Sequence, residues 1–309
     1  MHKTYSFFAN AKRHLRALMI LAAVVVFVGL PVRAAEGYFD SNGVKIRYVT
    51  EGTGEAVVLI HGWMSDSRMW GEDAAGETKL TITGTTGFQF IAIDSRGHGK
   101  SDKPHDVAKY GMEMAEDIVR LLDHLKIKKA HLVGYSSGAY IAGKVVGTYP
   151  KRVLSVLYAG QAPVMEGGKA SDFSETDAFS KAVEANDVES YLIDMSPANL
   201  PKPTREQAGQ FAKYIYAGKD LKALAAAGNS FRHLIVTDKQ LRKSKAPVIF
   251  IYGANESGHV KSQVAKAHKL LGRGEIKIIP DANHMTAVMK PEFGKSLINF
   301  LNASRVSKP

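Results

Sequence analysis

The stretch that decides the expected fold is Gly134-Tyr135-Ser136-Ser137-Gly138, which matches the pattern Gly-x-Ser-x-Gly. A serine hydroxyl is a weak nucleophile unless it is held at an exposed point beside a base. A sharp turn from a strand into a helix holds it there, and the flanking glycines remove side chains that would collide across the turn. Because the pattern also occurs by chance in roughly one of five to ten chains of this length, the sequence around it has to carry the interpretation.

The residues around this pentapeptide are those of a strand and a helix. The apolar run from Ala130 to Val133 precedes it, and the small apolar residues of 137–149 are typical of a helix packed tightly on a sheet. The N-terminal amides of such a helix point toward negative charge that develops at the serine. We therefore predict that Ser136 is a nucleophile rather than an incidental serine in a packing turn.

Five further apolar runs have the continuity of strands that are buried on both faces. They span residues 56–60, 88–93, 153–158, 247–252 and 275–279. Residues 110–125 and 259–271 show helical spacing of apolar residues, and 38–50 alternate around the hairpin signal Asn42-Gly43. Strands that alternate with helices favour βαβ units, so the predicted fold class is α/β with a mostly parallel, doubly wound sheet.

Residues 162–246 interrupt this alternation with helical patterns, several aromatic residues and three proline breaks. About 85 residues are too many for a simple crossover between two strands. We predict a core formed by residues 35–161 and 247–309, with 162–246 inserted as a helical cap over the sheet edge where ligands bind. The aromatic residues suggest an apolar acyl substrate, but a helical cap also needs such residues for its own core.

A serine nucleophile needs a base and an acid that orients the base. In this kind of fold they follow the serine in the order Asp/Glu and then His. Glu256 comes just after the run 247–252, and His284 comes just after 275–279. We predict that His284 takes the Ser136 proton and returns it to the leaving group, while Glu256 fixes the tautomer of His284.

Other residues fit these two roles less well. His259 lies near Glu256 in the sequence but begins a predicted helix, and Asp281 precedes His284 by three residues, which suits a turn better than an acid. The remaining candidate bases lie within or at the end of predicted elements, namely His124, His131 and His268.

The loop after the first buried run contains His61-Gly62-Trp63. In this architecture that loop supplies one donor of an oxyanion hole, and the residue after the nucleophile supplies the other. The predicted donors are the backbone N–H groups of Trp63 and Ser137. Core packing is the alternative explanation for the tryptophan.

Residues 94–101, Asp-Ser-Arg-Gly-His-Gly-Lys-Ser, are glycine-rich in the manner of a phosphate-binding loop. They lack the lysine-serine spacing of a P-loop, however. We expect a structural turn here.

The first 34 residues have the features of a signal peptide. Residues 1–16 contain four Lys/Arg and no acidic residue, and an apolar run of about fourteen residues follows in 17–30. This run is short for a membrane span, and the small residues of 31–35 suit a signal peptidase. We expect cleavage after Ala34 and export to the periplasm or the medium, without a stable membrane span, an uncleaved anchor helix being the alternative.

Composition narrows the class of function. The 309 residues are 45% hydrophobic and 23% charged, as in a folded globular protein. The net charge of +11 falls to +6 without residues 1–34, which hold five Lys/Arg and no acidic residue, and no basic cluster of nucleic-acid type occurs. We expect a small-molecule substrate and no nucleic-acid partner, cofactor or metal ion. The absence of cysteine excludes disulfides, thiol nucleophiles and zinc–thiolate sites.

Together these residues resemble the α/β-hydrolase superfamily, in the branch with a helical cap, over nearly all of 37–302. The resemblance rests on the following stretches: His61-Gly62-Trp63, Asp94 to Ser101, the pentapeptide at Ser136, Tyr149-Pro150-x-Arg152-Val153, Gly253 to Glu256, and His284. Two departures stand out. The acid is a glutamate where aspartate is more usual, and Ser137 stands where similar sequences often have a larger side chain.

The superfamily includes esterases, lipases, lactonases, C–C bond hydrolases, dehalogenases, epoxide hydrolases and cofactor-free haloperoxidases, so the resemblance does not identify a substrate. It does imply that a serine at the elbow disfavours the dehalogenases and epoxide hydrolases, which use aspartate there. Our leading hypothesis is an exported serine hydrolase that cleaves a carboxylic ester, thioester or lactone through an acyl-serine intermediate. The alternatives are a C–C hydrolase or perhydrolase with the same triad, and a non-catalytic binding protein on this scaffold.

Overall fold

A computed structural model describes residues 35–80, 87–196 and 201–306. The predicted signal peptide and its cleavage site after Ala34 lie outside the described residues. Within them, no helix combines the length and the apolar character that a membrane crossing requires.

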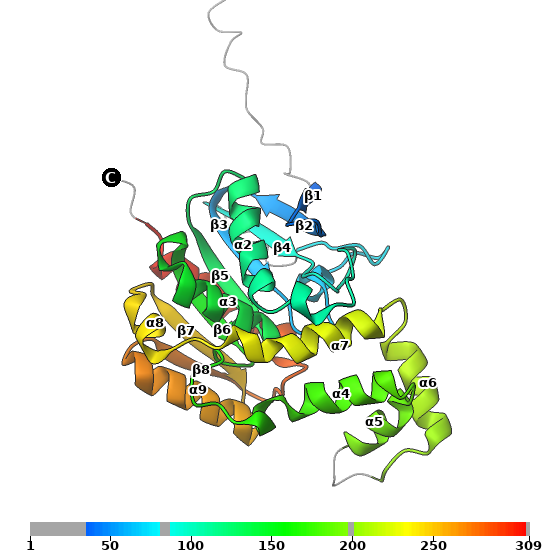
Figure 1. Cartoon of the computed structure of the whole chain (residues 1–309). Coiled ribbons are helices and arrows are strands. Elements are labelled where there is room, and N and C mark those ends of the chain that lie inside the picture. The colour runs from blue at the N-terminus through cyan, green and yellow to red at the C-terminus, as the bar shows by residue number, and fades with distance from the viewer. Residues whose placement is uncertain (1–34, 81–86, 197–200, 307–309) are drawn as a thin grey trace, which may run out of the picture. The chain divides into compact units, whose positions relative to one another are not determined.

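Eight strands form one sheet in the order β1-β2-β4-β3-β5-β6-β7-β8 (Figure 1). Their bounds are β1 Ala35–Asp40, β2 Lys45–Gly52, β3 Gly54–Ile60, β4 Gly87–Ile93, β5 Ala130–Tyr135, β6 Val153–Ala159, β7 Val248–Gly253 and β8 Glu275–Ile279. Strand β2 pairs antiparallel with β1 and with β4, and every other neighbouring pair is parallel. The predicted α/β fold with a mostly parallel sheet is confirmed.

The hairpin between β1 and β2 follows from two residues that tolerate positive φ. Asn42 has φ of 58° and Gly43 has φ of 77°, as a two-residue type I′ turn requires. Ser41 donates its backbone N–H to the carbonyl of Val44 at 2.8 Å and closes the turn. The antiparallel pair at the edge of the sheet is therefore specified by its own short sequence.

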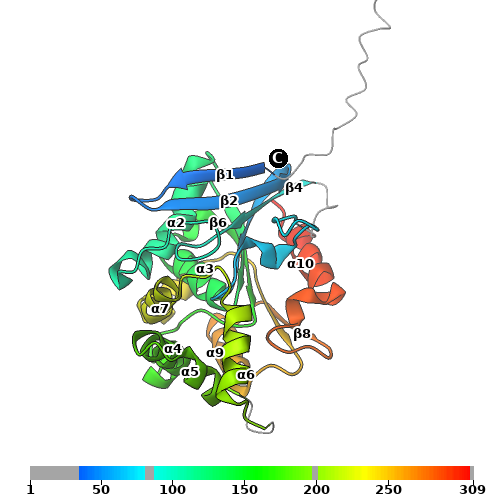
Figure 2. The same cartoon turned by 90° about the vertical axis from the view of Figure 1, so that its right-hand side faces the viewer.

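Helices cover both faces of the sheet. They are α2 Met112–His124, α3 Ser137–Thr148, α9 Gly258–Leu271 and α10 Pro291–Ala303. Val58 and Ile60 pack in one hydrophobic cluster with α2, α3 and α9, whereas Val57 and Leu59 pack in the other with α10. Alternate residues of one strand thus serve opposite faces, and Figure 2 shows α3 and α10 on opposite sides of the sheet.

The chain between β6 and β7 forms the remaining helices. They are α4 Ser174–Glu184, α5 Val188–Asp194, α6 Arg205–Ile215, α7 Leu221–Ser230 and α8 Asp238–Lys243. Short 3-10 turns occur here and elsewhere, namely η1 Ser67–Trp70, η2 Val107–Lys109, η3 Pro150–Arg152, η4 Ala170–Phe173, η5 Phe231–Leu234 and η6 Ala287–Met289.

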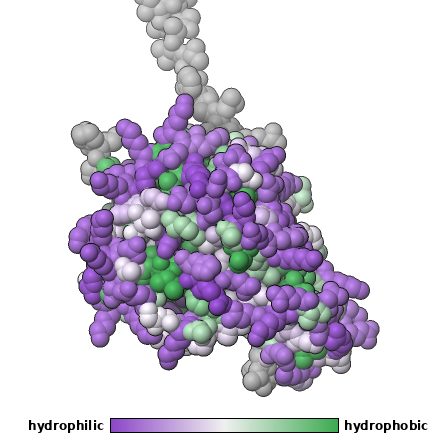
Figure 3. All heavy atoms as spheres, viewed as in Figure 1, coloured by the Kyte–Doolittle hydropathy of each residue, from purple (hydrophilic) through white to green (hydrophobic). Residues whose placement is uncertain are grey.

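Helices α4 to α7 gather beyond one end of the sheet (Figure 1). Phe179, Tyr191 and Tyr216 pack together in a small hydrophobic cluster of their own, so these cap aromatics serve the core of the cap. Helix α8 differs from the rest of the insertion because it packs against α3 and α9 of the core. Figure 3 shows that the face seen in Figure 1 is largely hydrophilic, with small separate apolar patches.

Residues 94–101 form a buried turn held by ion pairs. The Asp94 carboxylate accepts hydrogen bonds from Arg47 Nη1 at 3.1 Å and from the backbone N–H of Ser67 and of Lys100, each at 2.8 Å. A Cβ atom on Gly99 would lie 2.4 Å from the carboxylate carbon of Asp94, which explains the glycine. The side chains at the centre of this segment are turned inward, as expected of a structural turn.

The buried histidine of this turn gives a pH prediction. Burial, with His61 nearby, lowers the pKa of His98 to about 3, whereas an unfolded histidine titrates near 6.5. Below pH 6.5 the unfolded state therefore binds one more proton at this residue. The contribution of His98 is fully present above pH 6.5, and it falls by about 1.4 kcal/mol per pH unit as the pH drops toward 3.

We accordingly expect the free energy of unfolding to depend less steeply on pH in His98→Gln than in the wild type. Urea denaturation at several values between pH 7.5 and 4.5 measures both slopes. Parallel curves for the two proteins would contradict the prediction.

Candidate active site

Ser136 lies at the tip of the turn between β5 and α3, with φ of 54° and ψ of −121°. Positive φ is unusual for a residue other than glycine and costs on the order of 1–3 kcal/mol, which the surrounding structure must offset. The Ser136 N–H donates to the carbonyl of Ala159 on the neighbouring strand at 2.8 Å. Ser136 is partly exposed while its neighbours in the pentapeptide are buried, so the turn presents this one side chain.

The glycines of the pentapeptide are required by close backbone contacts. A Cβ atom on Gly134 would lie 2.3 Å from the carbonyl oxygen of Gly138, and one on Gly138 would lie 2.2 Å from that of Ile60. Gly62 is also close, because a Cβ there would lie 3.2 Å from Ser136 Cβ. The end of β3 therefore borders the nucleophile directly.

The structure brings together the three residues predicted as nucleophile, base and acid. His284 Nε2 lies 3.0 Å from Ser136 Oγ, and His284 Nδ1 lies 2.9 Å from Glu256 Oε2. A carboxylate only accepts hydrogen bonds, so Nδ1–H donates to Glu256 and the Nε2 lone pair faces the serine hydroxyl. The Glu256 side chain is 3% exposed and that of His284 is 36% exposed, so the acid is buried beneath a base that substrate can reach.

Two loops hold the acid and the base in place. A Cβ atom on Gly253 would lie 2.2 Å from the carbonyl oxygen of Ala282, and the Asn255 N–H donates to that same oxygen at 2.8 Å. The loop after β7 is thus packed closely on the loop after β8. The second oxygen of Glu256 accepts the backbone N–H of Ser257 at 2.9 Å.

Tyr135 is a further contributor that sequence reasoning missed. Its hydroxyl donates to the backbone carbonyl of His284 at 2.6 Å, and burial, followed by the nearby Glu256 charge, raises the pKa of this phenol. Tyr135 occupies a variable position of the Gly-x-Ser-x-Gly pattern, so no spacing in the sequence could reveal the contact.

The competing candidates lie in other surroundings. Asp281 is exposed, with φ of 48° in the turn after β8, while Glu256 is the carboxylate bonded to His284. His259 Nδ1 lies 3.8 Å from Asp172. The ring nitrogens of the other two pair elsewhere: His268 with the Gly274 carbonyl and His124 with the Tyr48 hydroxyl.

His131 belongs to a second Ser–His–Glu array, inside the sheet. Its Nδ1 lies 2.7 Å from Ser155 Oγ, and its Nε2 lies 3.0 Å from Glu55 Oε2. Both His131 and Ser155 are 0% exposed, so no substrate reaches this serine. The chain therefore contains an internal control for the exposed array at Ser136.

The two predicted oxyanion donors flank the nucleophile, Trp63 just after Gly62 and Ser137 at the start of α3. Among the described residues, neither backbone N–H has a hydrogen-bond acceptor. The Trp63 indole donates to the Leu224 carbonyl of the cap at 2.9 Å. Both amides are thus free to bind a negatively charged oxygen, while the tryptophan side chain anchors the cap.

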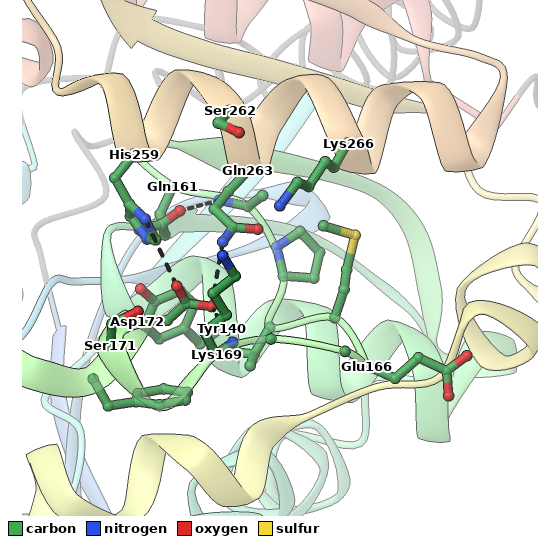
Figure 4. Close-up of a pocket in the computed structure, with 17 residues that line it drawn as sticks. Tyr140, Gln161, Glu166, Lys169, Ser171, Asp172, His259, Ser262, Gln263 and Lys266 are labelled. Carbon is green, nitrogen blue, oxygen red and sulfur yellow. Dashed lines mark hydrogen bonds and ion pairs between the residues drawn. The ribbon is translucent and has the colours of Figure 1, made fainter.

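A cavity of about 410 Å³ opens beside these residues (Figure 4). Tyr140, one turn after Ser136 on α3, lines it together with Gln161. The preceding residue, Gly160, adjoins the base, because a Cβ there would lie 3.2 Å from His284 Cε1. The cavity therefore begins next to the reacting groups. Within the described ranges, no group of three or more His, Asp and Glu residues is arranged to hold a metal ion.

The fold and these contacts define a class of protein: a doubly wound α/β sheet that presents a serine at a nucleophile elbow to a histidine–carboxylate pair. Residues 55–291 match the family model described as the alpha/beta hydrolase fold. The chain belongs to the α/β-hydrolase family.

Several relatives match over most of their length. The chain is 29% identical to the 2-(acetamidomethylene)succinate hydrolase of Mesorhizobium japonicum, over 87% of this chain and 98% of that protein. It is 24% identical to the non-heme chloroperoxidase CPO-A1 of Kitasatospora aureofaciens, over 84% and 97%. Among solved structures, a carboxylesterase study of Nitrososphaera gargenis gives a TM-score of 0.69 at 21% identity, over 87% and 98%, which shows the shared fold.

Proposed function

We propose that this protein is a serine hydrolase that cleaves a carboxylic ester, thioester or lactone through an acyl-enzyme on Ser136. The observation that carries the proposal is the unbroken set of contacts from Ser136 Oγ through His284 to Glu256, at 3.0 and 2.9 Å. These are hydrogen-bonding distances between nucleophile and base and between base and orienting acid.

The geometry supports a two-step reaction. Ser136 Oγ attacks the carbonyl carbon while His284 Nε2 takes its proton, and the resulting oxyanion accepts hydrogen bonds from the backbone N–H groups of Trp63 and Ser137. The bond to the leaving group then breaks as His284 returns the proton to it, which leaves the acyl-serine. Water, deprotonated by His284, attacks the acyl carbon, and the proton finally returns to Ser136.

A fluorophosphonate probe tests the nucleophile, because it reacts with activated serines. We expect the wild type to be labelled at Ser136 and Ser136→Ala to show no labelling by in-gel fluorescence and mass spectrometry. Ser155→Ala is the matched control, since that serine also contacts a histidine but is buried, and it should label like the wild type. Equal labelling of Ser136→Ala and the wild type would rule out the proposal.

A C–C hydrolase or perhydrolase using the same triad is the second candidate, which the chloroperoxidase relative supports. Nitrophenyl esters of graded acyl length, β-diketones and peracid formation from acetate and peroxide separate the reactions. Faster turnover of the diketones, or peracid formation that exceeds ester cleavage, would favour this candidate.

We also propose that the protein is exported, on the basis of the signal-peptide features of residues 1–34. N-terminal sequencing of the protein recovered from periplasm and medium is expected to begin at Ala35. A chain that keeps residues 1–34 in the membrane fraction would instead indicate an uncleaved anchor.

A further inference from the structure

We infer that the cavity beside the triad binds a carboxylate carried by the substrate, so that the preferred substrates are esters with a second, anionic end. This inference rests on the proposed ester hydrolase function and names its substrate class. It differs from the apolar substrate that the aromatic residues of the cap suggested, and it depends on two lysines and on the way the nearby acids are already used.

The cavity is continuous with the reacting groups along the chain. Ala159, whose carbonyl accepts the Ser136 N–H, is followed by Gly160 beside His284 and then by Gln161 in the cavity wall. Tyr140 of α3 forms the neighbouring part of the wall. A substrate held at Ser136 can therefore extend a short arm into the cavity.

Two ammonium groups line this cavity from different elements. Figure 4 shows Lys266 entering from helix α9 and Lys169 from the loop before η4 on the opposite side. Among the described residues, neither side chain has an acidic group within ion-pair distance. Two positive charges that face one concave site without a neutralising partner favour an anion there.

The acids that line the cavity are already engaged. The Asp172 carboxylate accepts the backbone N–H of Lys169 at 2.9 Å and the Gln263 amide at 3.4 Å, with His259 at 3.8 Å. Glu166 accepts the backbone N–H of Asp238 at 3.0 Å, and its carboxylate points away from both lysines in Figure 4. Neither acid neutralises the ammonium groups directly.

The rest of the wall suits a polar arm better than an alkyl chain. Amide and hydroxyl groups come from Gln161, Gln263 and Tyr140, and an alkyl chain would cover them without replacing their hydrogen bonds to water. The aromatic residues Phe179, Tyr191 and Tyr216 pack in the cap's own core and are absent from the described cavity wall. A carboxylate, by contrast, accepts hydrogen bonds from lysine ammonium groups and amides alike.

Matched substrate pairs test the inference. The 4-nitrophenyl hemiesters of succinate, glutarate and adipate are compared with neutral 4-nitrophenyl esters of equal chain length. 4-Acetoxybenzoate and its methyl ester place the charge on the leaving group instead. We expect the anionic member of at least one pair to have a kcat/KM about tenfold higher, the size of effect that charge-assisted hydrogen bonds give.

The variant Lys169→Gln/Lys266→Gln is expected to lower this anionic-to-neutral ratio about tenfold. The backbone N–H of Lys169 that binds Asp172 remains in the variant, and glutamine is a good helix former in α9. Lys269→Gln is the matched control, because it removes the same charge from an exposed position of the same helix outside the cavity wall. It should keep the wild-type ratio.

The outcomes separate this inference from the proposed function. A ratio near one for every pair, or a ratio that persists in the double lysine variant, overturns the carboxylate site while labelling of Ser136 and neutral-ester turnover still support the hydrolase. If no ester is cleaved, calorimetric titration of the Ser136→Ala protein with monomethyl glutarate decides the binding question alone. Binding that the double lysine substitution abolishes supports the site, and no binding overturns it.

Discussion

Ser136→Ala and His284→Ala are each expected to lower kcat for a nitrophenyl ester by about 10⁴- to 10⁶-fold, and the double variant should be no slower than either single variant. The reason is that the serine and the histidine act as one unit: without the base the hydroxyl is not activated, and without the hydroxyl the base has no proton to accept. Both contact atoms are within 3.0 Å. Steady-state rates for the three variants, with enough enzyme to detect slow turnover, measure the effect.

Glu256→Gln is expected to reduce kcat by about 10⁴-fold, because an amide of the same shape no longer stabilises the histidine cation and favours the wrong tautomer. His268→Gln is the control: that ring contacts the Gly274 carbonyl on the far end of helix α9 and should leave the rate near that of the wild type. Retention of a few per cent of activity by His284→Ala, or additive losses in the double variant, would show that these groups do not act together.

The parts of this molecule that local chemistry dictates could be predicted from the sequence. The pentapeptide at Ser136 needs glycines on both sides because the backbones of Gly134 and Gly138 touch neighbouring carbonyls, and such a need is visible in the residues themselves. Strands buried on both faces leave continuous apolar runs, which is why the sheet was found. The positions of Glu256 and His284 followed from strand order, since the carboxyl ends of parallel strands meet at one edge.

Contacts between distant segments could not be predicted in this way. The bond from Tyr135 to the His284 carbonyl and the array of Ser155, His131 and Glu55 join residues whose own sequence surroundings give no signal. The cavity wall likewise combines a loop and helix α9 that lie about ninety residues apart. Tertiary packing decides such contacts.

Two differences in helix placement have a simpler cause. Helix α10 was not predicted, although Phe293, Leu297 and Leu301 recur every fourth residue after a proline at its start, a pattern typical of a helix. Helix α8 lies within the predicted cap segment 162–246 but packs against the core, and only the position of its neighbours distinguishes it from the other helices of that segment.

The largest stability effect is expected at Arg96, which the glycine-rich segment 94–101 carries into the core. Its side chain donates to both oxygens of Asp117, at 2.7 and 2.6 Å, and both residues are 1% exposed. Removing one partner leaves a buried charge without compensation, so Arg96→Met should lower the free energy of unfolding by about 3–5 kcal/mol. Arg96→Met/Asp117→Leu removes both charges and should recover part of this loss.

Urea denaturation of these variants measures the effect, with Lys202→Met as the control. Lys202 also pairs with an acid, Asp194, at 3.5 Å, but its side chain is 61% exposed and that of the acid is 79% exposed, so its loss should change stability by less than about 1 kcal/mol. The contrast follows from burial, since water stabilises a lone aspartate at the surface and cannot reach one beside α2. Similar losses for Arg96→Met and Lys202→Met would mean that the segment 94–101 does not depend on this ion pair, and would reopen the question of why its polar residues are buried.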